Sequence, residues 1–443
     1  MMNKNRIIVI TFSYLLIALN VNCQTWSSVG TGVISSVADF AVDSINNELY
    51  VGGSFLTAGG INAPYIAKWN GIAWSDVGGG MNNNALTVVI SLCFFNGELY
   101  AAGSFDSAGG VPAKNIAKWN GANWSAVGAG ISGQVYTLAV YNGELYAGGF
   151  IDSAGSSSAH NIAKWDGSNW ADVGGGTDYW VLTLCTFNNE LFVGGGFFSA
   201  GGTTAYRVAK WNGLNWDSVG VGFNNTVNKL FVHNNQLYAG GEFTPVPGNN
   251  SRLISKWNGN AWQPLPSPSG GNNPAIRDLT SYNGSLYVTG EFTSPSYIAK
   301  FNGNNYAALG SGLSWVGECL IVFNNELYIG GYFSSAGGMP NTSGLAKWND
   351  AVGVFENVLL DHSIAAPNPF SQYTIFKLLE NLSSKPPYQL IIYSAFGKMI
   401  KEISDIKENV YKMERGKFPS GIYLYQWWDN SGKIIATGKV IAN

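Results

Sequence analysis

A repeat of about 46 residues constrains this chain of 443 residues more than any other feature. A phrase close to Ala-Lys-Trp-Asn-Gly recurs seven times, with its lysine at Lys68, Lys118, Lys164, Lys210, Lys256, Lys300 and Lys347. Two more phrases, Glu-Leu-Tyr-x-Gly-Gly and Trp-x-x-Val-Gly, recur with it, the second from Trp26 to the weaker Tyr306. Self-similarity at a fixed period of this size indicates units that bury their apolar faces only by stacking on neighbours.

Each repeat predicts four short strands. A β-branched segment such as 135–141 comes first, and an Asn-Gly or Asn-Asn pair then signals a tight hairpin. The Glu-Leu-Tyr, Ala-Lys-Trp and Trp-x-x-Val phrases supply the other three strands. Four strands per repeat predict a propeller blade, and seven blades closing a ring would leave no exposed sheet edges. We therefore expect an all-β fold with a seven-bladed β-propeller over 24–360.

The segment Trp26–Gly30 has no repeat before it. We predict that this segment completes the seventh blade and closes the ring. Val354–Val358 could occupy the same place, and the sequence does not decide between the two.

Composition excludes several function classes. The net charge of −3 argues against a nucleic-acid binder, which would carry a basic stripe. Three histidines leave little scope for histidine-based chemistry, and no cofactor or metal is expected. His160 and His233, the two in the repeats, fall in different repeats and at different repeat positions. Catalytic serine, zinc-protease, phosphate-loop and calcium-loop motifs are absent from the sequence.

The N-terminus predicts export. A basic start and an apolar run of about fifteen residues match a secretory signal peptide over 1–23. Lipid attachment at Cys23 is disfavoured because Asn22 stands where that signal wants a small residue. The apolar run is too short for a spanning helix, and no comparable run follows.

The repeats resemble those of kelch-type propellers. A strand ending in Gly-Gly, as at Gly52-Gly53 and Gly148-Gly149, precedes two spaced aromatics such as Trp69 and Trp74. The wording is similar to kelch-like repeats of secreted bacterial proteins. The gap between the aromatics is shorter than in kelch repeats, and in two repeats Gly-Gly is replaced, by Ala102-Gly103 and by Thr289-Gly290. The resemblance implies the fold but no particular function.

Residues 361–443 form a second module. They hold 10 basic and 7 acidic residues, against 12 and 20 over 24–360, and their alternating strands predict a small β-sandwich. The tail resembles the C-terminal sorting domain of type IX secretion substrates through Pro367, Asn368, Pro369, Phe370, the turn at Gly397, and Gly421 and Tyr423 in Pro-Ser-Gly-Ile-Tyr. The resemblance implies the type IX machinery as a partner and a location in the medium or at the outer cell surface.

The repeat residues are expected to be structural. The seven lysines could form a cationic ring, but the hairpin register places Glu48 beside Lys68 and Glu98 beside Lys118, which favours cross-strand ion pairs. Twelve of the sixteen tryptophans occupy repeat positions and are expected to pack between blades. Cys93, Cys185 and Cys319 fall in separate blades, so we expect free, buried thiols.

Two tryptophans outside the repeat pattern mark a candidate site. Trp180 and Trp315 precede the first strands of the fourth and seventh blades, where linking loops reach the mouth of the channel. With Asp178, Tyr179 and Glu318 nearby, they could stack on a sugar ring or bind a peptide, or they could simply pack their own loops.

We therefore predict a non-enzymatic exported propeller that binds an extracellular polysaccharide or protein. The alternative is a secreted carbohydrate-active enzyme, which would need Asp178 and Glu318 roughly 5–10 Å apart. A surface-layer component without a soluble ligand is a third interpretation.

Overall fold

The computed structural model describes residues 25–82, 87–349, 363–366, 368–378, 386–394, 399–416, 418–430 and 434–442. Throughout these ranges the regular secondary structure is β-strand, as the sequence predicts. The chain divides into two compact units, Gln24–Asp350 and a second that includes Ala351–Asn443. The expected boundary between residues 360 and 361 lies in 350–362, outside the described residues. The signal segment 1–23 also lies outside them.

Among the described residues of the first unit, seven antiparallel sheets have a run of four paired strands; in six of them these strands follow sequence order, and in the seventh the N-terminal strand β1 takes the last place. The first three are β2 (Val37–Asp43), β3 (Glu48–Gly53), β6 (Ile66–Trp69) and β7 (Trp74–Asp76); β8 (Val88–Phe95), β9 (Glu98–Ser104), β12 (Ile116–Trp119) and β13 (Trp124–Ala126); and β14 (Ile131–Tyr141), β15 (Glu144–Ala154), β17 (Ile162–Trp165) and β18 (Trp170–Asp172), with β16 (Ser157–Ser158) pairing β15. The fourth and fifth are β19 (Val181–Phe187), β20 (Glu190–Gly195), β23 (Val208–Trp211) and β24 (Trp216–Ser218); and β25 (Val227–His233), β26 (Gln236–Gly241), β27 (Ile254–Trp257) and β28 (Trp262–Pro264). The sixth and seventh are β29 (Ile276–Tyr282), β30 (Ser285–Thr293), β31 (Ser296–Phe301) and β32 (Tyr306–Ala308); and β33 (Gly317–Phe323), β34 (Glu326–Gly331), β35 (Leu345–Asn349) and β1 (Thr25–Ser27).

Short two-stranded ribbons extend the loops of three sheets. They are β4 (Thr57–Ala58) with β5 (Ile61–Asn62), β10 (Ser107–Ala108) with β11 (Val111–Pro112), and β21 (Ser199–Ala200) with β22 (Thr203–Thr204). The hairpins follow the predicted turn chemistry: Asn142 and Gly143, between β14 and β15, have φ of 48° and 74°. Positive φ at both central residues matches the twist of the flanking strands.

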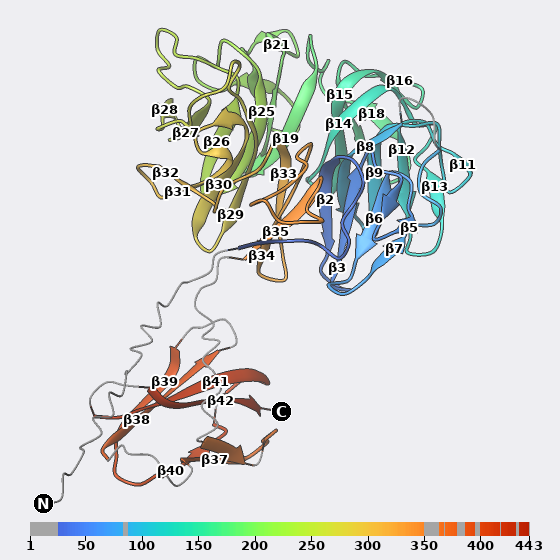
Figure 1. Ribbon diagram of the computed structural model, residues 1–443. Coiled ribbons are helices and arrows are strands. Elements are labelled where there is room, and N and C mark those ends of the chain that lie inside the picture. Colours follow the sequence, from blue (N-terminus) through green and yellow to red (C-terminus); the bar gives the residue numbers. More distant parts are fainter. Residues whose placement is uncertain are drawn as a thin grey trace, which may run out of the picture. The chain divides into compact units, whose positions relative to one another are not determined.

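The seven sheets follow one another in a closed, propeller-like circle. Each first strand contacts the first strand of the next sheet, in the order β2, β8, β14, β19, β25, β29 and β33, and β33 contacts β2 (Figure 1). The circle is closed by the N-terminal strand, because Trp26 of β1 pairs with Trp348 of β35. The expectation that Trp26–Gly30 completes the last sheet is thus confirmed. Val354–Val358 lies outside the described residues.

The repeat tryptophans join neighbouring sheets. The second tryptophan of each pair donates its indole N–H to a main-chain carbonyl of the preceding repeat, as Trp124 does to Val77 at 2.8 Å and Trp26 does to Leu309 at 2.9 Å. Its ring also packs against the first tryptophan, with centroids 5.4 Å apart for Trp119 and Trp124. In the sixth sheet Tyr306 replaces the tryptophan, and its longer reach takes its hydroxyl to Pro266 O at 2.9 Å. The predicted role of the repeat tryptophans in packing between sheets is confirmed.

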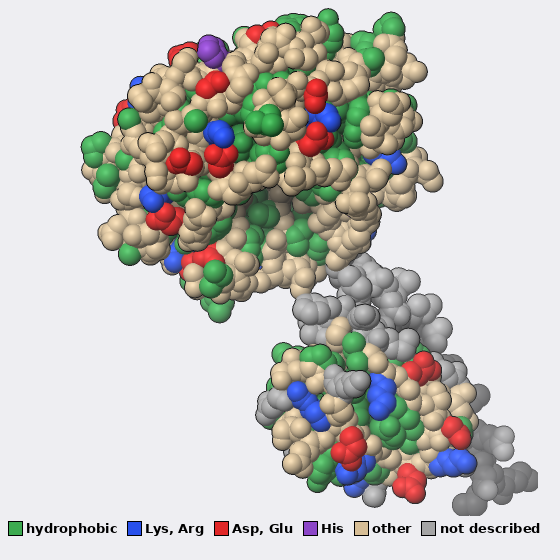
Figure 2. Space-filling model, turned by 180° about the vertical axis from the view of Figure 1, so that it is seen from behind, with side chains coloured by type: hydrophobic (Ala, Val, Ile, Leu, Met, Phe, Trp, Pro, Cys, Tyr) green, Lys and Arg blue, Asp and Glu red, His purple; other side chains and the backbone are tan. Residues whose placement is uncertain are grey.

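The repeat lysines are used in ion pairs. In five of the seven repeats the lysine Nζ lies 2.7–3.0 Å from a carboxylate oxygen of the glutamate on the neighbouring strand: Lys68–Glu48, Lys118–Glu98, Lys164–Glu144, Lys210–Glu190 and Lys347–Glu326. The face seen in Figure 2 accordingly has its acidic and basic side chains in small mixed groups. The cross-strand prediction is confirmed, and these five lysines are not free to form a cationic ring.

The three cysteines Cys93, Cys185 and Cys319 are free thiols, as expected. Cys319 is fully buried, whereas Cys93 and Cys185 are only half-buried. Cys93 on β8, Cys185 on β19 and Cys319 on β33 each pack with a different apolar cluster between neighbouring sheets.

The second unit contains two antiparallel sheets around one apolar cluster. One sheet has β36 (Ser363–Ala366), β37 (Tyr373–Leu378) and β40 (Val410–Glu414); the other has β39 (Met399–Ile406), β38 (Tyr388–Ser394), β41 (Gly421–Trp428) and β42 (Ile434–Ala442). Phe376 of the first sheet packs edge-on against Tyr425 of the second, with ring centroids 4.7 Å apart. Trp427 is fully buried in this cluster. In neither unit do the described residues form a helix long and apolar enough to cross a membrane.

Candidate functional site: an aromatic and acidic pocket on the sixth and seventh sheets

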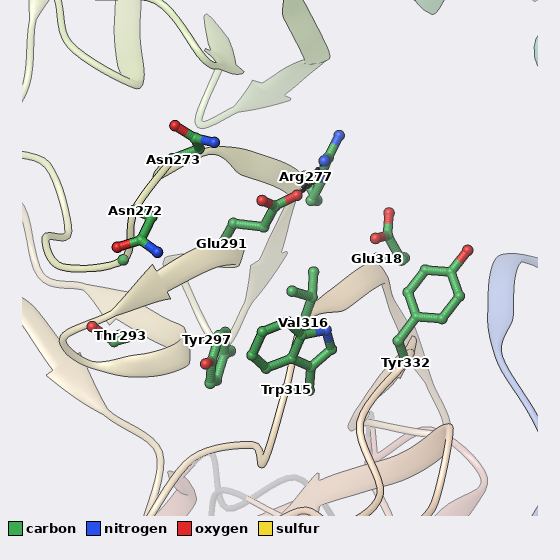
Figure 3. Close-up of a pocket in the computed structure, with 11 residues that line it drawn as sticks. Asn272, Asn273, Arg277, Glu291, Thr293, Tyr297, Trp315, Val316, Glu318 and Tyr332 are labelled. Carbon is green, nitrogen blue, oxygen red and sulfur yellow. Dashed lines mark hydrogen bonds and ion pairs between the residues drawn. The ribbon is translucent and has the colours of Figure 1, made fainter.

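A pocket of about 790 Å³ opens where the loops of the sixth and seventh sheets meet. It is lined by β29 and the segment before it, by the β30–β31 hairpin, by β33 and the segment before it, and by the residue after β34. The lining residues are Gly271, Asn272, Asn273, Arg277, Glu291, Thr293, Tyr297, Trp315, Val316, Glu318 and Tyr332 (Figure 3). All these segments lie on the same face of the circle, the one on which the last strand of a sheet leads into the first strand of the next. The size and the mixed aromatic and polar lining are typical of ligand pockets.

Three aromatic rings form the apolar part of the pocket. Trp315 is 56% exposed and Tyr332 is 64% exposed, values unusual for side chains of this size. Tyr297 packs against Trp315 with ring centroids 5.6 Å apart. Figure 3 shows Trp315 between Tyr297 on one side and Glu318 and Tyr332 on the other. The indole is therefore supported from one side while much of its surface stays open to solvent.

One arginine faces three carboxylates at this site. Arg277 donates from Nε to Glu291 Oε1 at 3.0 Å, and its Nη2 contacts the same oxygen. Its Nη1 lies 3.8 Å from Glu242 Oε1. Burial opposes the charge of Arg277, but Glu318, Glu291 and Glu242 outweigh burial and raise its pKa. The guanidinium is held in place by carboxylates of two neighbouring sheets.

Glu318 is the carboxylate without a dedicated partner. Within the described residues, its side chain makes no hydrogen bond or ion pair. Burial raises its pKa to about 7; Arg277 partly counters this, whereas Glu291 and Asp278 add to it. Near neutral pH the group can therefore accept or release a proton, or accept a cationic or hydrogen-bonding ligand.

The sequence-predicted site residues do not all come together. Trp315 and Glu318 line the pocket, whereas Asp178, Tyr179 and Trp180 belong to the equivalent loop of the fourth sheet and do not. Asp178 Oδ1 accepts the amide N–H groups of Phe198 and Ser199 at 2.8 and 3.0 Å. Ser314 closes the matching loop of the seventh sheet through its hydroxyl. Asp178 thus holds its own loop.

The two tryptophans occupy different repeat positions. Gly196 and Tyr332 donate their amides to the carbonyls of Trp180 and Val316, so Trp180 corresponds to Val316. Trp315 therefore corresponds to Tyr179, which is 41% exposed. Trp180 instead lies over Gly196, where an added methyl would be 2.2 Å from its Nε1. Trp180 packs across its own loop because no side chain is present there.

Sequence reasoning missed Arg277, Glu291 and Tyr332, but the repeat carries a signal for them. Glu291 and Tyr332 both follow the Gly-Gly position, where the first repeat has Ser54. Arg277 and Glu318 both occupy the second residue of the first strand. The pocket is thus built from two repeat positions that vary while the surrounding repeat residues stay nearly constant. Departures from the repeat at those positions would have indicated it.

A second set of charges lies inside the circle. Lys229 on β25 forms an ion pair with Asp278 on β29, with Nζ 2.8 Å from Oδ1. Asp278 Oδ2 also accepts the amide of Leu320 at 2.7 Å, and Asp39 Oδ2 accepts that of Leu92 at 2.8 Å. Burial raises the pKa of Asp39 to about 6, although Lys229 counters this across the circle. Each of these bonds joins two adjacent sheets, the charge of Lys229 also reaches Asp39 of the first sheet, and none of these groups lines the pocket.

The histidines are held apart. His160 lies in the third sheet between β16 and β17, and His233 ends β25 of the fifth sheet. The Nδ1 of His233 is 2.6 Å from Ser281 Oγ, and its Nε2 is 3.0 Å from the Asn234 amide nitrogen. Both ring nitrogens of His233 are thus engaged within the protein.

The described sorting-motif residues converge in the second unit. Asn368 Oδ1 accepts the amide of Ile441 at 2.8 Å, and its Nδ2 donates to Lys439 O at 2.9 Å. Phe370 is buried, and the Tyr423 hydroxyl donates to Pro419 O at 2.9 Å. Pro369 and Gly421 lie beside these residues in sequence. Pro367 and Gly397 lie outside the described residues. The first motif is thereby tied to the last strand of the chain.

Comparisons with known proteins show remote likeness only. No family model and no curated protein matches the chain. Among solved structures, PorZ, an essential surface component of the type IX secretion system of Porphyromonas gingivalis, has a TM-score of 0.46 at 16% identity. The match covers 92% of this chain and 59% of PorZ, so the chain spans about three fifths of that protein.

Two further solved structures show an equally remote likeness. The extracellular domain assigned to a hybrid two-component system of B. thetaiotaomicron has a TM-score of 0.46 at 11% identity, covering 95% of this chain and 57% of that one. A fungal alcohol oxidase of the AA5 family, solved with copper, has a TM-score of 0.42 at 12% identity, covering 95% and 99%. With these scores below 0.5, the likenesses carry no conclusion about activity or ligand.

Proposed function

We propose that the chain is an exported, non-enzymatic seven-bladed β-propeller of kelch-like repeats that binds an extracellular polymer or protein. Its C-terminal unit would be a β-sandwich sorting domain that engages the type IX secretion machinery and directs the protein to the cell surface or the medium. The signal-like N-terminus, the closed circle of sheets and the sorting-type motifs support this assignment.

One observation carries the binding role. Trp315 and Tyr332 are largely exposed at the rim of the pocket of about 790 Å³. Large aromatic side chains left open to solvent beside polar groups favour ligand contact, because burying them on a ligand recovers apolar area. At the repeat position of Tyr332, the other repeats carry a small residue, a carboxylate or, in the third repeat, Phe150.

Retention on immobilised polysaccharides and cell-surface proteins tests this role, with release of soluble product measured on the same samples. We expect wild-type protein to be retained without product, and Trp315→Ala to lose retention. Trp180→Ala, measured beside it, locates the site: loss there, with retention by Trp315→Ala, would assign binding to the fourth sheet instead. Thermal unfolding of each variant separates loss of binding from loss of fold.

A carbohydrate-active enzyme is the second candidate, and one observation favours it. Glu318 and Glu291 line the same pocket, and Glu318 has a raised pKa of about 7 beside an ion-paired Glu291. A pair of carboxyl groups in one pocket, one of them with a raised pKa, is what glycoside hydrolysis uses. Product release that disappears in both Glu318→Gln and Glu291→Gln would establish the enzyme and overturn the non-enzymatic proposal.

A further inference from the structure

The pocket has a surplus of negative charge. Arg277 is engaged by Glu291 through Nε and Nη2 and approached by Glu242 at 3.8 Å. Lys229, inside the circle, does not line the pocket and is paired with Asp278 at 2.8 Å. Glu318 interacts electrostatically with the same Arg277 but forms no hydrogen bond or ion pair within the described residues, so three carboxylates share one guanidinium. Because each positive group has at least one close carboxylate already, the pocket as a whole is complementary to a cation.

The rings around Glu318 suit an ammonium group. Trp315 and Tyr332 flank Glu318 in Figure 3, and both rings keep more than half of their surface exposed. Aromatic faces attract an ammonium ion through their quadrupole, most strongly where water is partly excluded. A carboxylate beside two such faces adds direct charge pairing and a charge-assisted hydrogen bond. This combination selects an amine over a neutral hydroxyl.

The opposite side of the pocket presents neutral polar groups. Asn272, Asn273 and Thr293 lie on the side of Tyr297, away from Glu318 and Tyr332 (Figure 3). Amides and hydroxyls can donate to and accept from sugar hydroxyl groups. A lysine side chain would supply an ammonium for Glu318 but no hydroxyls for these residues. A pyranose ring that carries an amine would use both sides and stack its apolar face on Trp315.

We propose that this pocket binds an amine-bearing saccharide, with the ammonium group on Glu318 and the pyranose ring on Trp315. This inference rests on the proposed function, since it names the ligand class of the same binding site. In this proposal Glu318 discriminates between a sugar with a free amine and one with an acetamide. Trp315 provides the stacking contact that both sugars would make.

Isothermal titration of the purified full chain at neutral pH tests the inference with three probes: a glucosamine tetramer, its fully N-acetylated counterpart and tetralysine. We expect the glucosamine tetramer to bind at least tenfold more tightly than the acetylated one, because acetylation removes the charge. Glu318→Gln should weaken binding of the glucosamine tetramer about ten- to a hundredfold and remove the preference. Asp217→Asn, an exposed position on β24, removes the same charge far from the pocket and should change affinity less than twofold.

The outcomes separate this inference from the proposed function. Equal affinity for both tetramers, lost together in Trp315→Ala, would overturn the amine preference while leaving a saccharide-binding propeller. Tetralysine binding as tightly as the glucosamine tetramer, and competing with it, would replace the saccharide by a basic peptide. If none of the three probes binds, the proposed ligand class is wrong. The retention experiments described above would then test the proposed function independently. If Glu318→Gln melts at a lower temperature, the ratio of the wild-type affinities for the two tetramers remains the decisive measurement of the amine preference.

Discussion

Replacing Lys229 by Met tests whether the charges inside the circle hold the sheets together. The ammonium of Lys229 lies 2.8 Å from Asp278 Oδ1, and it also lowers the pKa of Asp39 from the opposite part of the circle. Met has a similar length but no charge, so the variant leaves the carboxylates of Asp278 and Asp39 without the cation that stabilises both. The folded state should lose stability because those carboxylates stay desolvated.

The magnitude follows from how far each group is buried. Breaking a buried ion pair by removing one partner costs about 3–5 kcal/mol. The Asp278 side chain is only 5% exposed, but 34% of the Lys229 side chain can be reached by water, which screens part of the interaction. We therefore expect a loss of about 2–3 kcal/mol. With an unfolding entropy of about 2.1 cal/mol/K per residue over roughly 325 residues, the melting temperature should fall by about 3–4 °C.

The loss should depend on pH in a defined direction. Asp39 already has a folded-state pKa of about 6, above the usual value of 3.8, and Lys229 holds it down. Without Lys229 that pKa rises further, so the folded variant binds a proton more tightly than the unfolded chain. Protonation then stabilises the folded variant as pH falls through this pKa. The deficit of the variant should be largest at pH 8 and smaller at pH 5.5.

Urea and thermal unfolding followed by tryptophan fluorescence would measure both effects. Lys256→Met on β27 is the matched control, because its repeat has Gln236 where five others have the paired glutamate. We expect that control to shift the midpoint by less than 1 °C. A Lys229→Met variant that melts like the wild type, or whose deficit is the same at both pH values, would refute the argument that this cation neutralises Asp278 and Asp39.

Three further perturbations test other parts of the structure. Trp124→Phe removes the bond to Val77 O at 2.8 Å and part of a buried ring, and should cost about 2–3 kcal/mol in urea unfolding; a loss below 0.5 kcal/mol would contradict a role between sheets. Asn368→Ala removes two bonds to the last strand and should speed hydrogen exchange at Ile441 about tenfold or more, whereas unchanged exchange would place that tie elsewhere. Burial raises the pKa of Cys185 to about 11, so alkylation at pH 8 should be much slower in the native protein than in urea, and equal rates would show an accessible thiolate.

Most of the fold could be predicted because it depends on local, repeated signals. The local signals are the hairpin turns such as Asn142-Gly143, the Lys68–Glu48 pairing and the tryptophan pairs. Each arises within one repeat or between adjacent repeats, so its residues recur several times in the sequence. The closing strand at Trp26 could be anticipated for the same reason, since an unpaired edge needs a partner.

The pocket could be predicted only in part because its residues are exceptions to the repeat. Trp315 and Glu318 depart from the repeat pattern and could be found in the sequence. The alignment of the fourth and seventh repeats is shifted by one residue from the expected one, so the counterpart of Trp315 is Tyr179 and not Trp180.

The sequence by itself therefore determined the repeating β architecture and the cross-strand ion pairs, whereas the choice of Trp26 over Val354–Val358 as the closing segment came from the pairing of β1 with β35. Only the tertiary structure decided which exceptional residues meet. Arg277 of the sixth sheet lies 3.8 Å from Glu242 of the fifth sheet and interacts electrostatically with Glu318 of the seventh. The physical reason is that such contacts depend on how two neighbouring sheets are placed face to face, and no local preference encodes that placement.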